Sequence, residues 1–442
     1  MINWQKIKSE AADLLGDLIR IDTSNPPGNE AKGIDYIRKV VRSYDFDIET
    51  LETAPGRSNL LISYNGTYKN PLILLSHIDV VPADGKDWQH SPFAGEVVDD
   101  VMYGRGAIDT KHLIVMQMLV MMLLKRERHI LDRDLVMIVT ADEEAGSEYG
   151  LLKVLEQRSN LFQNADVISE GGGFPVLVNE IPHYLVETGQ KGLCRLRFKI
   201  TESENNPSFF ASNGHIYQSA MLVEKLNFID WNEEIPVTTA KLIKGLVGSV
   251  SHESYDESKP VNDQLNILKE AVSPFLYTLL KAMTKTTFSV TKWKAGVQGK
   301  TANTVDIEVD GRILPGMKKE NVIDRVQRAV GDDVDWEVID FSEGYESIYQ
   351  NKLFKYMQTT LEQKVPGSKT VPFISTGSSD GRHLRSYQSN VYGFSPVLPD
   401  MSFEKVLPLV HGVDERISLD SLLFGTKIMY SVMKKYYGRE RL

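Results

Sequence analysis

The stretch Leu72-Ile-Leu-Leu-Ser-His77-Ile-Asp79 decides the fold, because an unbroken apolar run of strand length ends there in a histidine and a carboxylate. An apolar run of this kind is typical of a strand that is covered on both faces of a sheet. Similar runs lie at 58–64, 135–141 and 166–169, and helical patterns separate them at 111–127 and 147–158. This alternation of strands and helices predicts an α/β fold.

The same pattern extends toward both chain ends. Residues 3–20 have helical periodicity, and a second helix is predicted at 29–44 after a turn, with Asn29 or Asn25 as its cap. The pattern returns after about residue 345, with a helix at 350–363, a strand at 391–394 and an amphipathic helix at 418–436. Both ends are therefore expected to belong to one α/β domain.

The middle of the chain shows a different pattern. Strands that alternate between apolar and polar residues are predicted at 193–200, 304–314 and 334–340, with helices near 215–228 and 318–329. Alternation is typical of a sheet with one face in water, so we expect a small α+β layer that is open on one side. Residues 250–300 are expected to interrupt this layer as an insertion with its own helix near 264–284.

These patterns predict a catalytic domain that is split by an inserted one. We expect the first part of the metal-binding catalytic domain at 1–189, the insert at 190–342 and the second catalytic part at 343–442. A chain of 442 residues is also too long for one ordinary core, so two domains are the default expectation.

The bulk composition is that of an ordinary globular enzyme, with 42% hydrophobic and 25% charged residues. The net charge of −10 argues against a nucleic-acid partner. The single cysteine, Cys194, excludes an internal disulfide and a thiolate zinc cluster, and it favours a reducing compartment. No signal peptide is visible after Met1, and the apolar run at 113–124 is shorter than the about 20 residues of a membrane span. We therefore expect a cytoplasmic protein without a membrane partner.

Carboxylates and histidines follow the predicted strands. His77, the pair Glu143 and Glu144, and Glu170 each come directly after a strand, and ligands of open α/β sheets bind beyond these ends. Asp109 lies on a glycine-rich turn before a helix, where the helix dipole favours a carboxylate. So many acidic groups at one sheet edge would repel one another without cations between them. The pattern therefore predicts a metal site, with two metal ions expected.

The spacing of these residues suggests different roles for some of them. His77 and Asp79 are two residues apart, so their side chains share a face, as suits a ligating histidine and the carboxylate that fixes its tautomer. Glu143 and Glu144 are adjacent and point in different directions. One of them can bind metal while the other faces a bound water.

Each of these motifs alone has an ordinary structural interpretation. A His-x-Asp pair is commonly a packing feature, an Asp-Glu-Glu run is commonly a solvated helix start, and Glu170 with its three following glycines can be only a loop. Their combined occurrence at successive strand ends, in this order, favours the metal site over these separate interpretations.

With these motifs in view, the sequence resembles the co-catalytic zinc hydrolase family of aminoacylase, acetylornithine deacetylase, succinyl-diaminopimelate desuccinylase and the related glutamate carboxypeptidases and dipeptidases. The resemblance covers nearly the whole chain. The matching stretches are Arg20-Ile-Asp-Thr-Ser-Asn-Pro-Pro-Gly-Asn-Glu30, Ser76-His-Ile-Asp-Val-Val-Pro82, Trp88-Gln-His-Ser-Pro-Phe93, Tyr103-Gly-Arg-Gly-Ala-Ile-Asp-Thr-Lys111, Asp142-Glu-Glu144, Ser169-Glu-Gly-Gly172, Arg312-Ile-Leu-Pro-Gly316, Ser379-Asp-Gly-Arg382 and His411-Gly-Val-Asp-Glu415.

The resemblance implies a zinc-exopeptidase-like fold, with a mixed, mostly parallel sheet and an inserted α+β, ferredoxin-like lid. It implies that Asp109 bridges two ions, and that the peptide bond after it is cis. His77 and Glu170 would complete the shell of one ion. Glu144 and His411 would complete the shell of the other.

The resemblance also implies an amide hydrolysis. Two divalent ions, Zn²⁺ first and Co²⁺ or Mn²⁺ as alternatives, lower the pKa of a bridging water and polarise the scissile carbonyl. Glu143 would act as general base and pass the proton to the leaving nitrogen, and Asp79 would orient His77. Arg312 and Asn303 match family positions that bind a substrate carboxylate, and the lid is expected to form a homodimer.

The sequence departs from the family in the lid. The family has Gly-His-x-Ser-x-Pro there, whose histidine helps to bind the oxyanion, whereas this chain has Asn205-Asn-Pro-Ser-Phe-Phe-Ala211. The nearest histidine, His215, is expected to open the next helix, and it is the candidate replacement. His112 also stands where the family has a glycine after Lys111.

These features support a two-metal hydrolase that acts on a peptide or N-acyl amino acid bearing a carboxylate. The alternative is a catalytically impaired metal-binding protein that keeps the fold, which the missing lid histidine supports, because one lost oxyanion donor can cost about 10²–10³ in rate. Retention of Glu143 and of all five expected ligands argues against that alternative. A hydrolase with a single metal is a third possibility.

Overall fold

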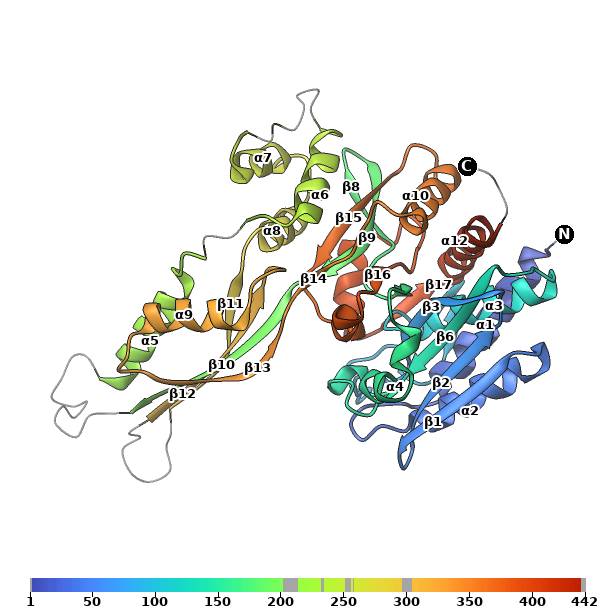
Figure 1. Cartoon of the computed structure of the whole chain (residues 1–442), viewed down its shortest axis with the longest axis horizontal. Coiled ribbons are helices and arrows are strands. Elements are labelled where there is room, and N and C mark those ends of the chain that lie inside the picture. Colours follow the sequence, from blue (N-terminus) through green and yellow to red (C-terminus); the bar gives the residue numbers. More distant parts are fainter. Residues whose placement is uncertain are drawn as a thin grey trace.

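The computed structural model describes residues 2–201, 214–231, 234–250, 256, 258–295 and 304–438. In this part of the chain, one large sheet carries helices on both faces, and a four-stranded sheet extends away from it (Figure 1). Among the described helices, none is both long and apolar enough to cross a membrane.

The large sheet is mixed. Its strands follow the order β1-β2-β6-β3-β7-β16-β9-β14, and β8 and β15 also pair with β9. The bounds are β1 Asp47–Ala54, β2 Arg57–Tyr64, β3 Tyr68–His77, β6 Arg133–Thr140, β7 Asp166–Ser169, β8 Phe174–Val178, β9 Ile181–Gln190, β14 Tyr345–Glu346, β15 Lys369–Ser375 and β16 Asn390–Gly393. The central neighbours β6, β3, β7 and β16 are parallel, whereas β1, β2 and β6 pair antiparallel at one edge. The predicted α/β class with a mixed sheet is confirmed.

The apolar run before His77 is buried on both faces of this sheet. Leu72 and Leu74 pack into one core cluster, and Ile73 and Leu75 pack into another on the opposite face. All four are at most 1% exposed. Successive side chains of a strand point to opposite faces, so a strand covered on both sides must be apolar throughout.

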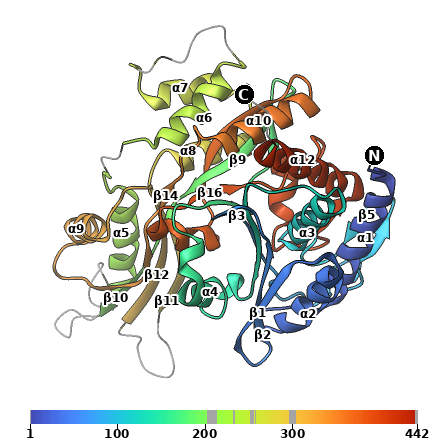
Figure 2. The same cartoon turned by 45° about the vertical axis from the view of Figure 1, so that its right-hand side comes forward.

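Helices cover both faces. One face carries α1 (Trp4–Arg20), α2 (Glu30–Val41), α3 (Lys111–Arg126), α10 (Lys352–Lys364) and α12 (Leu419–Tyr437), and the other carries α4 (Leu151–Arg158). Figure 2 shows α4 and the group of α1, α2 and α3 on opposite sides of the sheet. These helices confirm the predicted ones, with ends that differ by at most four residues. A small additional sheet consists of β4 (Glu96–Val98), β5 (Val101–Tyr103) and β17 (Arg416–Ser418).

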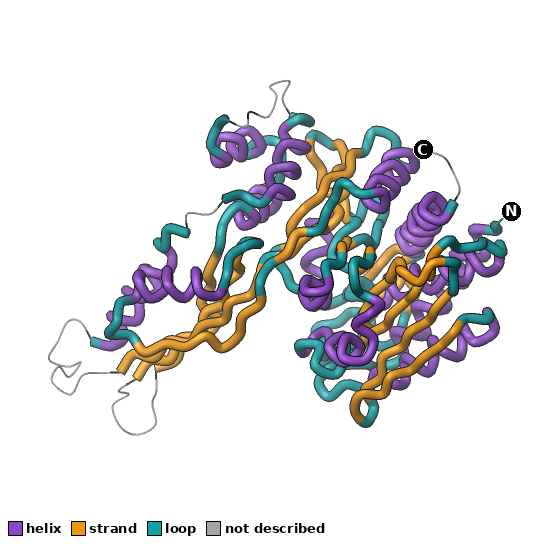
Figure 3. Tube along the Cα trace, viewed as in Figure 1, coloured by secondary structure: helices purple, strands orange, loops and turns teal. Residues whose placement is uncertain are grey.

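The second sheet forms the lid. Its antiparallel strands follow the order β11 (Thr287–Ala295), β12 (Thr304–Ile313), β10 (Gly192–Thr201) and β13 (Asp335–Ser342). Helices α5 (His215–Asn227) and α9 (Lys319–Val330) share a core with one face of this sheet. Buried and less buried residues alternate along β12, as expected for a sheet with one wet face. Figure 3 shows the strand path continuing from the large sheet into the lid.

The prediction for residues 250–300 is wrong in two respects. The expected single helix is two helices, α7 (Val261–Leu268) and α8 (Pro274–Met283), because Pro274 has no N–H to continue a helix and starts one instead. The Ser273 side chain caps α8 by accepting from Leu276 N at 3.1 Å. The end of the segment is no interruption, since β11 is the edge strand of the lid sheet beside β12.

Helices from the middle of the chain also pack on the large sheet. Helix α6 (Val237–Val247) forms a core cluster together with α7, α8 and residues of β8, β9 and β15. The chain leaves the large sheet at Gln190 and returns at Tyr345, and these two residues pair with each other. The segment between them therefore contributes both to the lid and to the helices α6, α7 and α8 that pack on the large sheet.

Candidate metal centre

The strand ends bring the predicted metal ligands together. His77 is the last residue of β3, Glu143 and Glu144 lie in a short 3-10 turn (Glu143–Ala145) after β6, and Glu170 follows β7. Parallel pairing places His77 opposite Thr140, so the three strands end at one edge of the sheet. Ligand sites in α/β sheets lie beyond this edge.

Asp109 lies between two imidazoles. Its Oδ1 is 3.1 Å from His77 Nε2, and its Oδ2 is 3.1 Å from His411 Nε2. Asp109 precedes α3, and the peptide bond from Asp109 to Thr110 is cis, as expected. The two carboxylate oxygens therefore face two different histidines, which is the arrangement of a bridging ligand.

Each imidazole also has a glutamate of its own. His77 Nε2 lies 3.4 Å from Glu170 Oε2, and His411 Nε2 lies 3.1 Å from Glu144 Oε2. The five residues thus divide into two sets that share Asp109. His77 is buried, whereas the His411 side chain is half exposed. The set with His77 therefore faces the protein interior, and the set with His411 faces the solvent.

These separations fit divalent metal ions. Two ligand atoms about 2.0–2.1 Å from one tetrahedral zinc ion lie about 3.3–3.4 Å apart, and the four separations above are 3.1–3.4 Å. His77, Asp109 and Glu144 also offer ligand atoms that all lie within 4.8 Å of one another. Glu144 Oε1 is buried, and no described residue forms a hydrogen bond with it. Mixed nitrogen and oxygen donors suit zinc, cobalt or manganese.

Without a metal ion, the two histidines are the local cations. Burial lowers the pKa of His77, but Glu170, Asp109 and Asp79 together raise it well above its ordinary value. Hydrogen bonds to Asp109 and Glu144 raise the pKa of His411 to about 10. Burial raises the pKa of Asp109, but the two imidazoles outweigh it and lower that pKa. The cluster therefore demands positive charge between its carboxylates.

Glu143 belongs to neither ligand set, although its carboxylate lies within 4.8 Å of ligand atoms of His77 and Glu170. Its side chain is 10% exposed, and Arg382 Nη1 lies 3.8 Å from its Oε1. Burial raises the pKa of Glu143 well above its ordinary value, although His77 lowers it, and Glu170 and Asp380 add to the rise. A buried carboxyl with a raised pKa beside a metal site has the properties of a general base that must also release its proton.

Asp79 contacts His77 in two ways. Its backbone carbonyl lies 3.0 Å from His77 Nδ1, and its Oδ1 lies 3.4 Å from the same nitrogen. Burial raises the pKa of Asp79, but His77 and a hydrogen bond from Asn25 lower it below its ordinary value. An ionised Asp79 can therefore hold the proton on Nδ1 and leave Nε2 for a metal ion.

A cavity of about 390 Å³ opens beside the metal residues. The metal residues Asp109, Glu143, Glu144, Glu170 and His411 line it. Its apolar lining, which we call the apolar wall, consists of Ile108, Phe174, Leu279, Met283, Phe373, Phe403, Val406, Leu407 and Val410. The predicted carboxylate ligand Arg312 also lines the cavity. Its Nη1 is buried and has no hydrogen-bond partner within the described ranges.

Of the other substrate-binding candidates, the structure describes His215 alone. Asn303 and the segment 205–211 fall outside the described residues. His215 begins α5, as predicted, and is buried in the lid. It does not appear among the described residues that line the cavity. His112 does line it, with no hydrogen-bond partner for either ring nitrogen in the described part of the chain, and burial lowers its pKa to about 4.

Glu415 is a site residue that the sequence pattern does not identify, although it ends the matching stretch His411-Gly-Val-Asp-Glu415. It is fully buried and accepts hydrogen bonds from Ile108 N at 2.6 Å, Asp109 N at 2.9 Å, Gly106 N at 3.0 Å and Arg105 Nη1 at 2.8 Å. It therefore ties the segment that carries His411 to the turn that carries Asp109. A glutamate four residues after a candidate ligand was the available signal.

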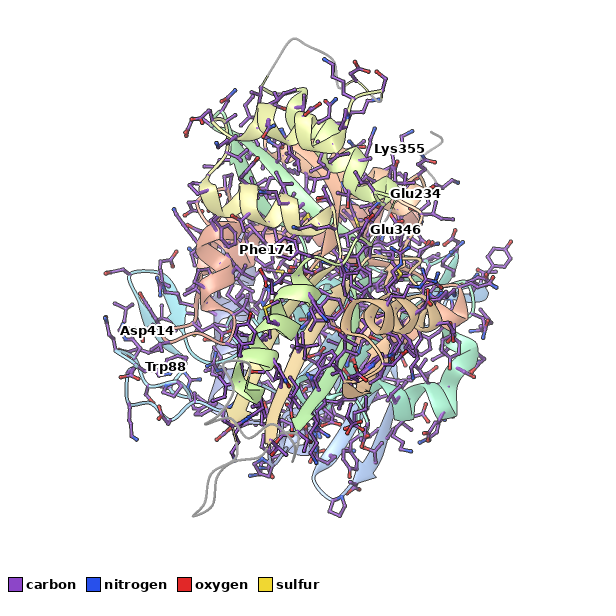
Figure 4. All side chains as sticks on the ribbon, turned by 90° about the vertical axis from the view of Figure 1, so that its left-hand side faces the viewer. Trp88, Phe174, Glu234, Glu346, Lys355 and Asp414 are labelled. Atoms are coloured by element: carbon purple, nitrogen blue, oxygen red, sulfur yellow. The ribbon has the colours of Figure 1, made fainter. Side chains whose placement is uncertain are left out.

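The same C-terminal segment also holds the loop before the Asp109 turn. Asp414 Oδ1 accepts from Gln89 N at 2.8 Å, and Trp88 and Asp414 lie side by side at the surface (Figure 4). The Arg105 guanidinium stacks over Trp88, 5.2 Å from the ring centroid. Contacts across more than 300 residues thus fix the position of His411.

Comparisons with known proteins identify the family of this chain. The chain is 27% identical over 448 residues to the N-fatty-acyl-amino acid synthase/hydrolase PM20D1 of Xenopus tropicalis, covering 95% of this chain and 84% of that protein. Its fold is similar to an M20 family metallo-carboxypeptidase, Sso-CP2, from Sulfolobus solfataricus, with a TM-score of 0.72, 18% identity and 99% of each chain covered. It is also similar to the Bacillus subtilis YXEP protein, a dinuclear metal binding peptidase, with a TM-score of 0.61, 12% identity and coverage of 98% and 99%. Residues 73–435 match Peptidase family M20/M25/M40, so the chain belongs to that family and is a metal-dependent amidohydrolase.

Proposed function

We propose that this protein is a two-metal hydrolase that cleaves an amide bond in a small substrate bearing a carboxylate. The observation that carries the proposal is the position of Asp109, whose two oxygens each lie 3.1 Å from a different imidazole. Each imidazole has its own glutamate at 3.1–3.4 Å. His77, Glu170 and Asp109 would hold one ion, and His411, Glu144 and Asp109 the other, with Zn²⁺ as the first choice.

Glu143 is the proposed general base. When bound, the two ions supply the Lewis acidity that lowers the pKa of a water molecule and polarises the substrate carbonyl. Glu143 accepts the proton of that water and delivers it to the leaving nitrogen. The raised pKa of its carboxyl supports both transfers, because burial makes this group accept a proton more readily than an ordinary glutamate does. Asp79 holds the tautomer of His77 throughout.

The cavity supports a substrate with two unlike ends. Arg312 presents an unpartnered buried Nη1, which suits a carboxylate. The apolar wall suits an acyl chain or an apolar side chain, and a relative is named an N-fatty-acyl-amino acid synthase/hydrolase. We therefore propose N-acyl amino acids with an apolar acyl group as the first substrate class, and dipeptides as the second. Asn303 remains a proposed partner of Arg312.

We also propose a homodimer through the lid. Ile216, Tyr217 and Phe228 on and beside α5 are 59%, 55% and 79% exposed, and burial of such apolar side chains would favour association. In such a dimer, His215 would serve as the lid histidine that the sequence otherwise lacks. The division into 1–189, 190–342 and 343–442, with the middle part as a lid, belongs to the same proposal. The single buried Cys194 supports a reducing, cytoplasmic location.

Metal content and amide hydrolysis, measured on one preparation, test the proposal. Chelator-treated protein is titrated with Zn²⁺, Co²⁺ or Mn²⁺ and assayed on a panel of dipeptides and N-acyl amino acids. We expect two ions per chain at saturation and activity that follows their binding. One ion per chain at saturation would favour the single-metal enzyme. Two bound ions without turnover of any substrate would favour the impaired protein.

A variant pair tests the role of Glu143. Glu143→Gln should keep both ions and lose about 10²–10⁴ in kcat, the usual worth of general-base catalysis. Glu148→Gln is the matched control, because Glu148 lies close by in the chain and is exposed. Equal activity of Glu143→Gln and wild type would exclude Glu143 as the base.

A further inference from the structure

A buried hydrogen-bond network lies behind the metal-binding residues. It consists of Asn25, Glu30, Arg57, Asp79 and Asp142, and we call these five residues the Asn25 network. None of them is more than 8% exposed. Three carboxylates and one guanidinium in such a place are costly unless their hydrogen bonds are satisfied. Apart from Asp79, which orients His77, the members of the network have no place in the catalytic steps proposed above.

The network reaches the site through Asp79. Asp79 Oδ1 accepts from the backbone N–H of Glu143 at 3.1 Å, and Oδ2 accepts from the backbone N–H of Glu144 at 3.1 Å. One carboxylate therefore holds the backbone of the proposed base and of a proposed ligand. The same carboxylate lies beside His77, at 3.4 Å.

Asp142 holds the same turn from the other side. It directly precedes Glu143 and has a φ of 64°, in the left-handed region. Its Oδ1 accepts from Arg57 Nη2 at 2.7 Å, and its Oδ2 accepts from Tyr149 N at 2.9 Å. Arg57 also donates twice to Glu30, at 2.8 Å each. A side chain at an unfavourable φ needs such external support to stay in place.

Asn25 joins the two carboxylates. Its Nδ2 donates to Asp79 Oδ2 at 3.0 Å and to Asp142 Oδ1 at 2.9 Å. An amide nitrogen carries two hydrogens, so one Nδ2 can satisfy both acceptors. An aspartate in this place would add a third negative charge, and an alanine would leave two buried acceptors without this donor.

The backbone around Asn25 is fixed against the strand end that carries the site. Asn25 N donates to Val80 O at 2.9 Å, Val80 N donates to Thr23 O at 3.2 Å, and Thr23 Oγ1 donates to Ile78 O at 2.6 Å. The position of the Asn25 amide is therefore set by the same segment that contains Asp79. Its placement does not depend on a flexible side chain alone.

We infer that Asn25 is a positioning residue for the reaction: its amide bridges Asp79 and Asp142, which hold the turn of Glu143 and Glu144 from both sides. The inference rests on the proposed function, because it assigns a purpose to the positions of the proposed base and ligand. Loss of a group that orients metal ligands typically costs about 10–100-fold in activity or metal affinity, and Asn25 acts on these ligands through Asp79.

The test compares Asn25→Ala and Asn25→Ser with wild type. We expect Asn25→Ala to lower kcat about 10–100-fold at saturating metal, with KM changed less than about threefold because Arg312 and the apolar wall are untouched. Asn25→Ser restores one donor and should recover part of kcat. The visible absorption of the Co²⁺-loaded protein should also change in Asn25→Ala, because Glu144 and His77 shift.

Asn390→Ala is the matched control. Asn390 Nδ2 also donates to a carboxylate, Asp166 Oδ1, at 3.1 Å, but it lies away from the cavity. This variant should lower the melting temperature and keep both kcat and the Co²⁺ spectrum. The inference would be overturned if Asn25→Ala had the kcat and the Co²⁺ spectrum of wild type. It would also be overturned if Asn25→Ala lost no more kcat than the control variant Asn390→Ala.

The two proposals fail in distinguishable ways. If wild type hydrolyses no amide, the proposed function fails, and the Co²⁺ spectrum of Asn25→Ala still decides the positioning role. If wild type is active and Asn25→Ala matches it in kcat and spectrum, only the positioning role fails.

Discussion

Replacing Gly28 by alanine should damage the Asn25 network from a position that contacts no metal ligand. Gly28 has a φ of +82°, and a Cβ added to it would lie 2.4 Å from Arg57 Nε and 2.5 Å from Arg57 Cζ. No side chain can occupy that space unless the guanidinium moves. Arg57 would then leave the hydrogen bonds of 2.8 Å to Glu30 and 2.7 Å to Asp142.

Two effects set the expected loss of unfolding free energy. The left-handed backbone costs alanine about 1–2 kcal/mol. Displacing one partner of a buried ion pair costs about 3–5 kcal/mol. Gly28→Ala should therefore lose about 4–7 kcal/mol of unfolding free energy. Its kcat should also fall, as expected for Asn25→Ala.

Gly56→Ala is the control that separates these effects. Gly56 has nearly the same φ, +80°, but a Cβ there would meet no atom closer than 3.9 Å. It should lose only the about 1–2 kcal/mol of backbone strain. Urea unfolding of both metal-free variants, followed by circular dichroism, measures the difference. If the unfolding free energies of the two variants differ by less than about 1 kcal/mol, the position of the Arg57 guanidinium does not depend on the absence of a side chain at Gly28.

Four further predictions concern ions and substrate. Metal binding at pH 7 should release at least about two protons, because the imidazoles of His77 and His411 are protonated in the metal-free protein and burial raises the pKa of the Glu170 carboxyl to about 7. Titration calorimetry in two buffers of different ionisation enthalpy measures this number, and a value near zero contradicts the charge states. The raised pKa of His411 stabilises the metal-free protein fully below about pH 6.5, and this stability is lost as the pH rises through about 10, so urea midpoints should fall over that window. Arg312→Met should raise KM about 10–100-fold with little change in kcat, and Arg312→Lys should recover only part, because an ammonium lacks the bidentate fork; unchanged KM in steady-state assays would remove Arg312 from the site. Phe403→Ala should lower kcat/KM for a decanoyl amino acid at least about tenfold relative to the acetyl analogue, and a parallel loss for both would show that the apolar wall does not contact the acyl chain.

Much of the fold could be predicted because its signals are local. The run from Leu72 to His77 is apolar throughout, since both faces of β3 are buried. The same pattern located the ends of β6 and β7 and hence the residues that meet there. Parallel strands end at one edge, so sequence order was enough to group His77, Glu144 and Glu170.

The lid was harder to predict at β11, whose residues are mostly polar and exposed. Residues 287–295 form β11, yet most of that strand is exposed at the edge of the lid sheet, so it lacks the apolar alternation that marked β10 and β12. The break between α7 and α8 was also missed, although Pro274 signals it. Polar edge strands carry little hydrophobic pattern, and only their pairing identifies them.

The Asn25 network could not be predicted because its contacts are long-range. Asn25 bonds to Asp79 and Asp142, which lie 54 and 117 residues away. Its sequence context suggested a helix cap, but Asn29 takes that position without a capping hydrogen bond, and Asn25 donates into the site instead. A buried asparagine among carboxylates is visible only once the strands are assembled.

The chain departs from the large sheet and rejoins it at two residues that pair with each other, Gln190 and Tyr345. A gene rearrangement could therefore exchange everything in between as a cassette, since its two junctions are adjacent and the residues of both proposed ion shells remain outside it. The exchanged piece would nevertheless carry Leu279, Met283 and Arg312 with it. Such a swap would retain the hydrolytic apparatus and redirect it to other molecules, which offers a simple evolutionary route to diversity in substrate choice.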